Sequence, residues 1–333
     1  MLMLIVAFLL SFVLGVCIAP LVIKIAKKAR AGQTILHYVE AHKQKDGTPT
    51  LGGLIFLLSS LVMFFVFAGG SNKLAVVALV VFFAYGLLGF LDDFIKVRTH
   101  KNLGLKPYQK IIGQAGIAIL VAVFVYNSAF LGGNIFLPWG LVEVDIGWWI
   151  IPLTIIAFLA MTNSANLTDG LDGLAGGVSF VSLISLTAIC LITKNYEVSL
   201  GANLIYQQEM NNLALLGVVV AGGVLAFLCF NAYPAKIFMG DTGSLALGGV
   251  LCAIASFSGQ LLVLLIICIT FVVSALSVIV QVLHFKRTKK RILLMAPLHH
   301  HFEKKGVNEC KIVAIYIIVT IVSSAVAVML CLI

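Results

Sequence analysis

Long apolar runs recur along the whole chain and restrict it to a membrane-embedded helical fold. Ten runs lie at 2–23, 51–69, 73–91, 108–127, 147–163, 172–192, 212–230, 243–258, 261–284 and 312–333. A helix needs about 20 mostly apolar residues to cross a bilayer core of about 30 Å. Hydrophobic residues make up 61% of the chain and charged residues only 11%, which excludes an ordinary soluble domain and a disordered chain. The sequence predicts an all-α integral membrane protein with ten transmembrane helices.

The loops between the runs are too short to form a soluble domain, so residues 1–333 are predicted to be a single polytopic membrane domain. The fifth and eighth runs are short, and we expect them to be tilted or partly re-entrant. The Gly-rich segment 129–146, which contains Pro138, is predicted to form a hairpin or a surface loop. Seven cysteines lie mostly inside apolar runs without a CxxC pattern, which is typical of small buried hydrophobes.

Lysine and arginine are concentrated in alternate loops. Twenty of the 22 lie in the segments 24–50, 92–110, 231–242 and 285–311. The other loops contain only Lys73 and Lys194. Because positively charged loops stay in the cytoplasm, both termini are predicted to face outward. The formal net charge of +9 then belongs to one face, which attracts anionic lipid headgroups and nucleotides.

Five aspartates lie at the ends of apolar runs in a chain with only 13 acidic residues: Asp92, Asp93, Asp169, Asp172 and Asp241. An ionised carboxylate at bilayer depth costs about 2.5–3.5 kcal/mol on insertion scales, so such groups are rare and usually functional. The predicted topology places all five in or beside cytoplasmic loops. Together they predict a polyanionic site for a divalent metal and a phosphate group.

The pair Asp92-Asp93 ends the third run, and Lys96 follows it on the same predicted helix. Adjacent carboxylates repel each other unless a cation or a proton neutralises them. Hard oxygen donors of this kind suit Mg²⁺, which keeps water ligands and recruits phosphate. Lys96 can bind a phosphate oxygen or neutralise a carboxylate. A solvated helix end with a local ion pair is the alternative.

Two further loops are rich in polar residues. The segment 163–173 contains Asn166, Asp169 and Asp172, and the spacing of its two acids predicts that they share a helical face. The segment 231–244 supplies a carboxylate beside a helix start, where unpaired N–H groups favour anions. Its Phe238 can stack on a base. The alternatives are helix capping for the first loop and an aromatic interface anchor for Phe238.

Two more motifs lie in predicted cytoplasmic loops, one around the histidines 299–301 and one just before the second apolar run. His299, His300 and His301 cannot all bind one metal from a helix, and nearby residues complete no zinc set. Histidine can instead hold phosphate or uracil-type acceptors. Thr48 and Pro49 fit an N-cap and first residue of the second helix, and with Lys43 and Lys45 nearby they can also hold phosphate. A purely structural helix start is the alternative.

Five motifs in order resemble those of the polyprenyl-phosphate N-acetylhexosamine-1-phosphate transferases. They are GTPTLGG from residue 47, FLDDFIK from 90, NLTDGLDGLA from 166, NAYPAKIFMGDTGSLALGG from 231 and APLHHHFE from 296. The resemblance covers essentially the whole chain, and each motif lies in a predicted cytoplasmic loop. The PLHHHFE stretch is more similar to the branch that uses UDP-N-acetylmuramoyl-pentapeptide (UDP-MurNAc-pentapeptide) than to the N-acetylglucosamine branch.

The resemblance implies a Mg²⁺-dependent enzyme of the bacterial cytoplasmic (inner) membrane. It would transfer phospho-N-acetylmuramoyl-pentapeptide from UDP-MurNAc-pentapeptide to undecaprenyl phosphate, giving lipid I and UMP in peptidoglycan synthesis. Membrane lipids and a second copy of the chain, as a homodimer, are the other expected partners, with no nucleic-acid partner. Phosphoryl transfer needs charge neutralisation and alignment, which agrees with the carboxylates and lysines of the loops.

The resemblance also implies residue roles. The catalytic set is Asp92, Asp93, Asp241, His299 and His300, with Asp241, Asp92 and Asp93 as metal ligands. The substrate-binding set is Lys45, Thr48, Lys96, Lys106, Lys110, Asn166, Asp169, Asp172, Asn231, Phe238 and His301. Within it, Asp172, Asn231 and Phe238 would contact uridine.

The sequence leaves the chemistry and the substrate open. Asp92 can deprotonate the lipid phosphate, one aspartate can attack to form a phosphoryl-enzyme, or the lipid phosphate can attack directly. An acceptor phosphate is already largely ionised near pH 7, which favours direct attack. UDP-N-acetylglucosamine is the alternative donor. An ion-coupled transporter is the alternative function, although the acids lie at one face and no broken-helix pair is evident.

Overall fold

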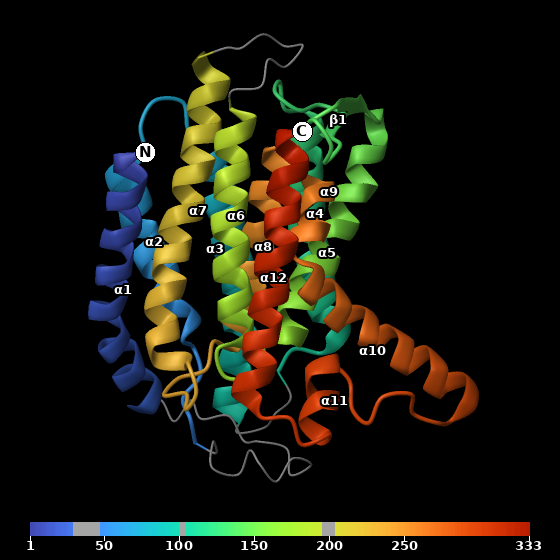
Figure 1. The fold of residues 1–333 in the computed structure, drawn as a ribbon. Coiled ribbons are helices and arrows are strands. Elements are labelled where there is room, and N and C mark those ends of the chain that lie inside the picture. Colours follow the sequence, from blue (N-terminus) through green and yellow to red (C-terminus); the bar gives the residue numbers. More distant parts are fainter. Residues whose placement is uncertain (29–46, 100–103, 195–203) are drawn as a thin grey trace.

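The computed structural model describes residues 1–28, 47–99, 104–194 and 204–333 and is almost entirely helical (Figure 1). The long helices are α1 (Leu2–Lys28), α3 (Lys73–Thr99), α4 (Pro107–Tyr126), α5 (Ile150–Thr168), α6 (Leu174–Thr193), α7 (Leu204–Asn231), α8 (Gly240–Phe257), α10 (Ile269–Thr288) and α12 (Glu309–Leu332). Shorter elements are α2 (Gly53–Phe67), α9 (Leu261–Ile267), α11 (Leu298–Lys304) and the 3₁₀ turn Gly147–Trp149. Strands β1 (Asn134–Phe136) and β2 (Glu143–Asp145) form an antiparallel hairpin, which is one of the two alternatives expected for segment 129–146.

Nine helices in the described ranges are long and apolar enough to cross a membrane. The remaining predicted span, 51–69, corresponds to α2, which has only 15 residues. Both termini lie at one end of the bundle, and α11 lies at the opposite end, as Figure 1 shows. The motif-bearing loops that join α7 to α8 and α10 to α12 are at the α11 end. This agrees with termini and polar motifs on opposite sides.

Helix α8 lies at the centre of the bundle and positions the polar residues at its first turn. Its side chains are almost all buried, and it packs against α3 and α5. A Cβ atom at Gly89 of α3 would lie 2.1 Å from the carbonyl oxygen of Asp241, so only glycine permits this approach of the two helices. The close packing brings the end of α3, with Asp92 and Asp93, against the start of α8.

Two local predictions differ from the structure. The ninth apolar run is broken at Cys268 into α9 and α10, and α10 projects away from the bundle (Figure 1). The prediction of one continuous span at 261–284 is therefore wrong. The second helix begins at Gly53, with Gly52 as its N-cap, so Thr48 and Pro49 do not start it. The backbone of Pro49 instead accepts a hydrogen bond from Phe238 N–H at 2.8 Å.

At the end of the bundle where the termini lie, one buried carboxylate closes the connection between α2 and α3. The Glu209 side chain of α7 accepts hydrogen bonds from the Ser71 hydroxyl at 2.5 Å, Lys73 N–H at 3.0 Å and Leu74 N–H at 2.8 Å. These donors include the first backbone N–H groups of α3, which lack partners within the helix. Glu209 therefore caps α3 from a neighbouring helix.

Candidate active site

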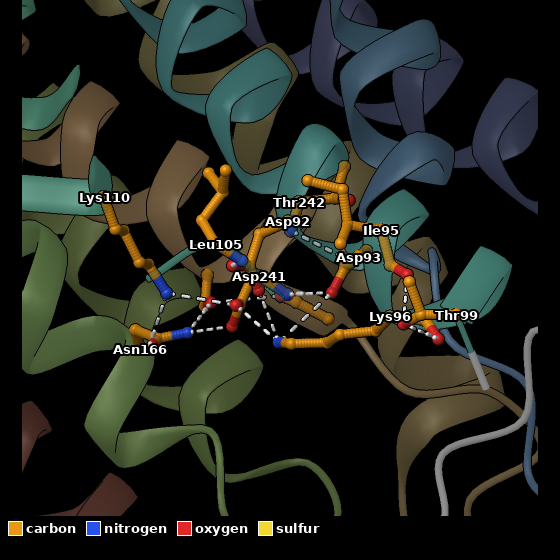
Figure 2. Close-up of polar contacts among 12 residues, drawn as sticks. Asp92, Asp93, Ile95, Lys96, Thr99, Leu105, Lys110, Asn166, Asp241 and Thr242 are labelled. Carbon is orange, nitrogen blue, oxygen red and sulfur yellow. Dashed lines mark hydrogen bonds and ion pairs between the residues drawn. The ribbon is translucent and has the colours of Figure 1, made fainter. Parts of the chain in front are cut away.

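Three aspartates from two helices form a carboxylate cluster, which we define as Asp92, Asp93 and Asp241 (Figure 2). One oxygen of each lies within 4.8 Å of the others, and Asp92 and Asp93 are buried. The sequence separates Asp241 from the pair by about half the chain, and the contact between α3 and α8 brings them together. The predicted gathering of these acids is therefore present in the fold.

Asp93 is held by the first turn of α8. Its Oδ2 accepts hydrogen bonds from Thr242 N–H at 2.9 Å and the Thr242 hydroxyl at 2.7 Å, and its Oδ1 accepts from Asp241 N–H at 3.2 Å. A carboxylate at a helix N-terminus is stabilised by the unpaired N–H groups and by the helix dipole. Asp93 thus fixes α3 to α8 and orients the turn that carries Asp241.

Two lysines and an amide converge on Asp241 from three other helices, as Figure 2 shows. Its Oδ2 accepts from the ammonium of Lys96 at 2.8 Å and of Lys110 at 3.0 Å. Its Oδ1 accepts from the Asn166 amide at 2.5 Å, and that amide also donates to the Ser244 hydroxyl at 2.8 Å. The predicted residues Lys96, Lys110 and Asn166 therefore lie directly against the cluster.

Asp92 is fixed by Lys96 and by the segment that enters α4. Its Oδ2 lies 2.5 Å from the Lys96 ammonium, and its Oδ1 accepts from Leu105 N–H at 2.7 Å. A Cβ at Gly104 would come within 2.5 Å of Asp92 Oδ1, so the backbone can approach the carboxylate only at a glycine. Gly104 and Leu105 are contacts that the sequence motifs did not indicate.

A second polar group forms where the α5–α6 turn meets α11. Asp169 follows the end of α5, and α6 begins at Leu174, so Asp169 and Asp172 do not share a helical face as predicted. A Cβ at Gly170 would lie 2.6 Å from His299 Nε2 and 2.9 Å from His300 Nε2. The turn and the two histidines are therefore in direct contact, although about 130 residues separate them in the sequence.

Burial and charge shift two pKa values in this second group. Burial, together with the carboxylates of Asp241, Asp93 and Asp172, raises the pKa of Asp169 to about 8. Burial and the nearby His300 lower the pKa of His299 to about 3, so His299 is neutral at physiological pH. Both of its ring nitrogens are buried and lack a hydrogen-bond partner among the described residues. His300 Nδ1 lies 2.9 Å from Glu303.

The residues predicted to contact uridine mainly join loops to one another. The Asp172 carboxylate accepts from Ala235 N–H at 3.0 Å, and the side-chain oxygen Oδ1 of Asn231 accepts from Gly173 N–H at 2.9 Å. Phe238 is half-buried, and its carbonyl accepts from Gly52 N–H at 2.8 Å. These bonds connect the α5–α6 turn, the α7–α8 loop and the segment before α2 at one end of the bundle.

Four predicted site residues lie away from the cluster or outside the described part of the chain. Thr48 lines a separate cavity of about 650 Å³ with Lys24, Lys27 and Lys236. Lys106 is the exposed N-cap of α4. His301 Nδ1 accepts from Leu294 N–H at 3.1 Å and so anchors the loop before α11. Lys45 lies outside the described residues.

Two further contacts support the site and were missed from the sequence. Gln114 and Asn163 exchange amide hydrogen bonds at 2.8 and 3.5 Å, about one helical turn from Lys110 and Asn166. Glu309, at the start of α12, accepts from Asp172 N–H at 2.7 Å. An amide inside an apolar run, as at Gln114, is the signal that could have indicated the first pair.

Comparison with known proteins identifies the family. Residues 74–259 match Glycosyl transferase family 4. Proteins named phospho-N-acetylmuramoyl-pentapeptide-transferase are similar over nearly their full length. The protein from Clostridium novyi (strain NT) is 39% identical over 94% of this chain and 92% of its own. The Clostridium perfringens (strain SM101 / Type A) protein is 39% identical over 95% and 93%, and the one from Halalkalibacterium halodurans is 40% identical over 94% and 93%. The chain therefore belongs to Glycosyl transferase family 4 and, within it, to the phospho-N-acetylmuramoyl-pentapeptide-transferases.

Proposed function

We propose that this protein transfers phospho-N-acetylmuramoyl-pentapeptide from UDP-MurNAc-pentapeptide to undecaprenyl phosphate, releasing UMP and forming lipid I. The observation that carries the proposal is the convergence of three carboxylates, two lysines and an amide from four helices at one end of a membrane bundle. Such a group suits phosphoryl transfer, which depends on positioning and on stabilising the phosphate charge. The family assignment favours this reaction over the ion-coupled transporter.

Mg²⁺ is the cofactor that the carboxylate cluster fits best. Its ligand atoms are hard oxygens from three closely spaced carboxylates, the donor type that Mg²⁺ prefers. Asp93 already accepts three hydrogen bonds from the start of α8. Asp92 and Asp241 would therefore be the principal ligands, and Asp93 would orient Asp241. A bound Mg²⁺ would neutralise phosphate charge and polarise the reacting phosphorus–oxygen bonds.

The lysines support direct attack by the lipid phosphate. Lys96 and Lys110 both point at Asp241 Oδ2 and can donate to a diphosphate placed beside it. Both oxygens of Asp92 already accept from Lys96 and Leu105, and these contacts hinder attack by the carboxylate on phosphorus. We therefore assign Asp92 to the positioning of charge rather than to a phosphoryl-enzyme intermediate.

The α5–α6 turn with His299 and His300 would form the nucleotide end of the site. Neutral His299 has two ring nitrogens without described partners, and uracil offers both donors and acceptors to such a group. Asp172 and Asn231 would shape this end through their loop contacts, and Phe238 would stack on the base.

The proposed topology has ten spans, with both termini outside the cytoplasmic membrane of a bacterium and the site facing the cytoplasm. The cation distribution and the position of the termini opposite α11 support it. In a cysteine-free background, Lys305→Cys should react only with reagents that reach the cytoplasm. Labelling from outside intact cells would contradict the orientation.

The reaction is tested by UMP release with two donors. Purified protein with undecaprenyl phosphate and Mg²⁺ should release UMP from UDP-MurNAc-pentapeptide, and chelation of the metal should stop it. Specificity for UDP-N-acetylglucosamine would instead assign the protein to the alternative donor. Sedimentation in detergent would test the expected homodimer.

A further inference from the structure

Lys96 lies among the same carboxylates that we propose as the metal site. Its ammonium is 2.5 Å from Asp92 Oδ2, 2.8 Å from Asp241 Oδ2 and 3.9 Å from Asp93 Oδ1. Figure 2 shows the side chain reaching across the cluster from the end of α3. A cation at this position satisfies three carboxylates that would otherwise repel one another.

The oxygens that Lys96 contacts most closely are the ones that a metal needs. Asp92 Oδ1 accepts from the backbone of Leu105, and the oxygens of Asp93 accept from the start of α8. Asp92 Oδ2 and Asp241 Oδ2 accept from ammonium groups, and the Asp92 and Asp241 carboxyl groups also lie against each other. An ammonium and a divalent cation would therefore compete for these two oxygens.

The charge balance gives this competition a consequence for the donor substrate. Three carboxylates with Lys96 and Lys110 carry one net negative charge, which repels a diphosphate. Addition of a divalent cation changes this to one net positive charge, which attracts it. Lysine has a flexible four-carbon stem, so an ammonium displaced from the carboxylates can stay close and pair with the incoming phosphate.

We infer that Lys96 is a resident counter-cation that a divalent metal must displace, and that its released ammonium then binds the diphosphate of the nucleotide donor. The inference rests on the proposed metal site. The metal and the nucleoside diphosphate then bind cooperatively. The metal removes the net negative charge that repels the diphosphate, and the diphosphate pairs with the ammonium that the metal displaces. By linkage, each ligand must raise the affinity of the other by the same factor.

The test is Mn²⁺ binding, measured by electron paramagnetic resonance on the full-length protein in detergent. Lys96→Gln should bind Mn²⁺ at least about tenfold more tightly than wild type without nucleotide, because a competing charge has been removed. UDP should raise the Mn²⁺ affinity of wild type several-fold, after correction for Mn²⁺–UDP in solution, and should raise that of Lys96→Gln much less. Unchanged or weaker Mn²⁺ binding by Lys96→Gln would overturn the inference.

Three variants separate the possible causes. Arg98→Gln removes an exposed cation from the same helix. If Arg98→Gln gained as much Mn²⁺ affinity as Lys96→Gln, the gain would reflect only the lower net positive charge of the protein, and the inference would be overturned. Lys96→Arg keeps a charge whose planar fork suits carboxylates, so it should bind Mn²⁺ no more tightly than wild type. This variant also provides the test if Lys96→Gln does not fold, and tighter binding by it would contradict us. Asp241→Asn should weaken Mn²⁺ binding; if it does not, the proposed metal site itself fails.

Discussion

Buried carboxylates at the two ends of the bundle have opposite surroundings. Glu209, at the end where the termini lie, accepts hydrogen bonds from a hydroxyl and two backbone N–H groups, all uncharged. The carboxylate cluster at the other end gathers three acids and two lysines within a few ångströms. One isolated acid at a helix start is fully accounted for by capping. Three mutually repelling acids are not, since separate caps would stabilise the same helices without the repulsion.

Asp93 is both a helix cap and a member of the carboxylate cluster. It caps α8 as Glu209 caps α3, yet its carboxylate also lies 3.9 Å from Lys96. The cap fixes the first turn of α8 and hence Asp241, which is the acid with the most charged partners. We therefore expect Glu209 to affect stability alone, Asp241 to affect activity alone and Asp93 to affect both. Substitutions at the three positions can test this division.

The largest effect should follow Asp241→Asn. The amide keeps the shape but removes the charge that faces both lysines and the proposed Mg²⁺, so UMP release should fall at least about 10³-fold. Thermal unfolding in detergent should stay close to wild type, because the helix cap at Asp93 is intact. Near-normal turnover with unchanged Mg²⁺ dependence would place the metal at Asp92 and Asp93 instead.

Asp93→Asn should lose both activity and stability. The amide replaces one acceptor oxygen with a donor that faces the N–H groups of α8, which costs about 1–3 kcal/mol for a buried unsatisfied group. Asp241 then loses its fixed orientation, so kcat should fall by about 10²-fold. Thr242→Val, which removes one of the bonds to Asp93, should shift both properties in the same direction by smaller amounts. Loss of activity without loss of stability would show that the cap is dispensable.

Glu209→Gln should lower stability alone. The donors at the start of α3 lose one acceptor oxygen, and we expect a destabilisation of about 1–2 kcal/mol. The kcat and KM of the folded fraction should match wild type, because Glu209 lies at the end of the bundle opposite the site. A fall in kcat without a change in melting temperature would contradict the division between the two ends.

The sequence predicted which residues gather at one end of the bundle far better than it predicted individual contacts. Cation counts and run lengths are sums over many residues, so single errors matter little, and they placed the aspartates and Lys96 at one end. Contacts such as Asp92 with Leu105 N–H depend on distances below 3 Å between segments that pack only in the folded bundle. The run 261–284 is mostly apolar and has no proline or glycine near Cys268, so hydropathy could not reveal the break there.

Glu209 was missed for a related reason. It precedes the seventh predicted span, where the sequence indicates a solvated loop. In the structure α7 begins earlier, at Leu204, and Glu209 is buried. The helical face expected for Asp169 and Asp172 failed because Gly173 adopts a left-handed conformation with φ 80° and ends the turn before α6.

The last prediction concerns the pH dependence of stability at Asp169, whose folded pKa of about 8 lies well above its ordinary value of 3.8. Between these values the unfolded chain has released the proton while the folded protein keeps it. Asp169 therefore contributes a destabilisation that is absent below about pH 4, grows as the pH rises and is complete above about pH 8. Asp169→Asn mimics the protonated acid and lacks this pH dependence. In melts with the metal chelated, the variant should gain melting temperature relative to wild type as the pH rises from 5 to 8. Asp145→Asn, an exposed acid at the other end, is the control and should show no such trend. A constant difference for Asp169→Asn across this range would mean that Asp169 is ionised throughout and adds a negative charge near the carboxylate cluster.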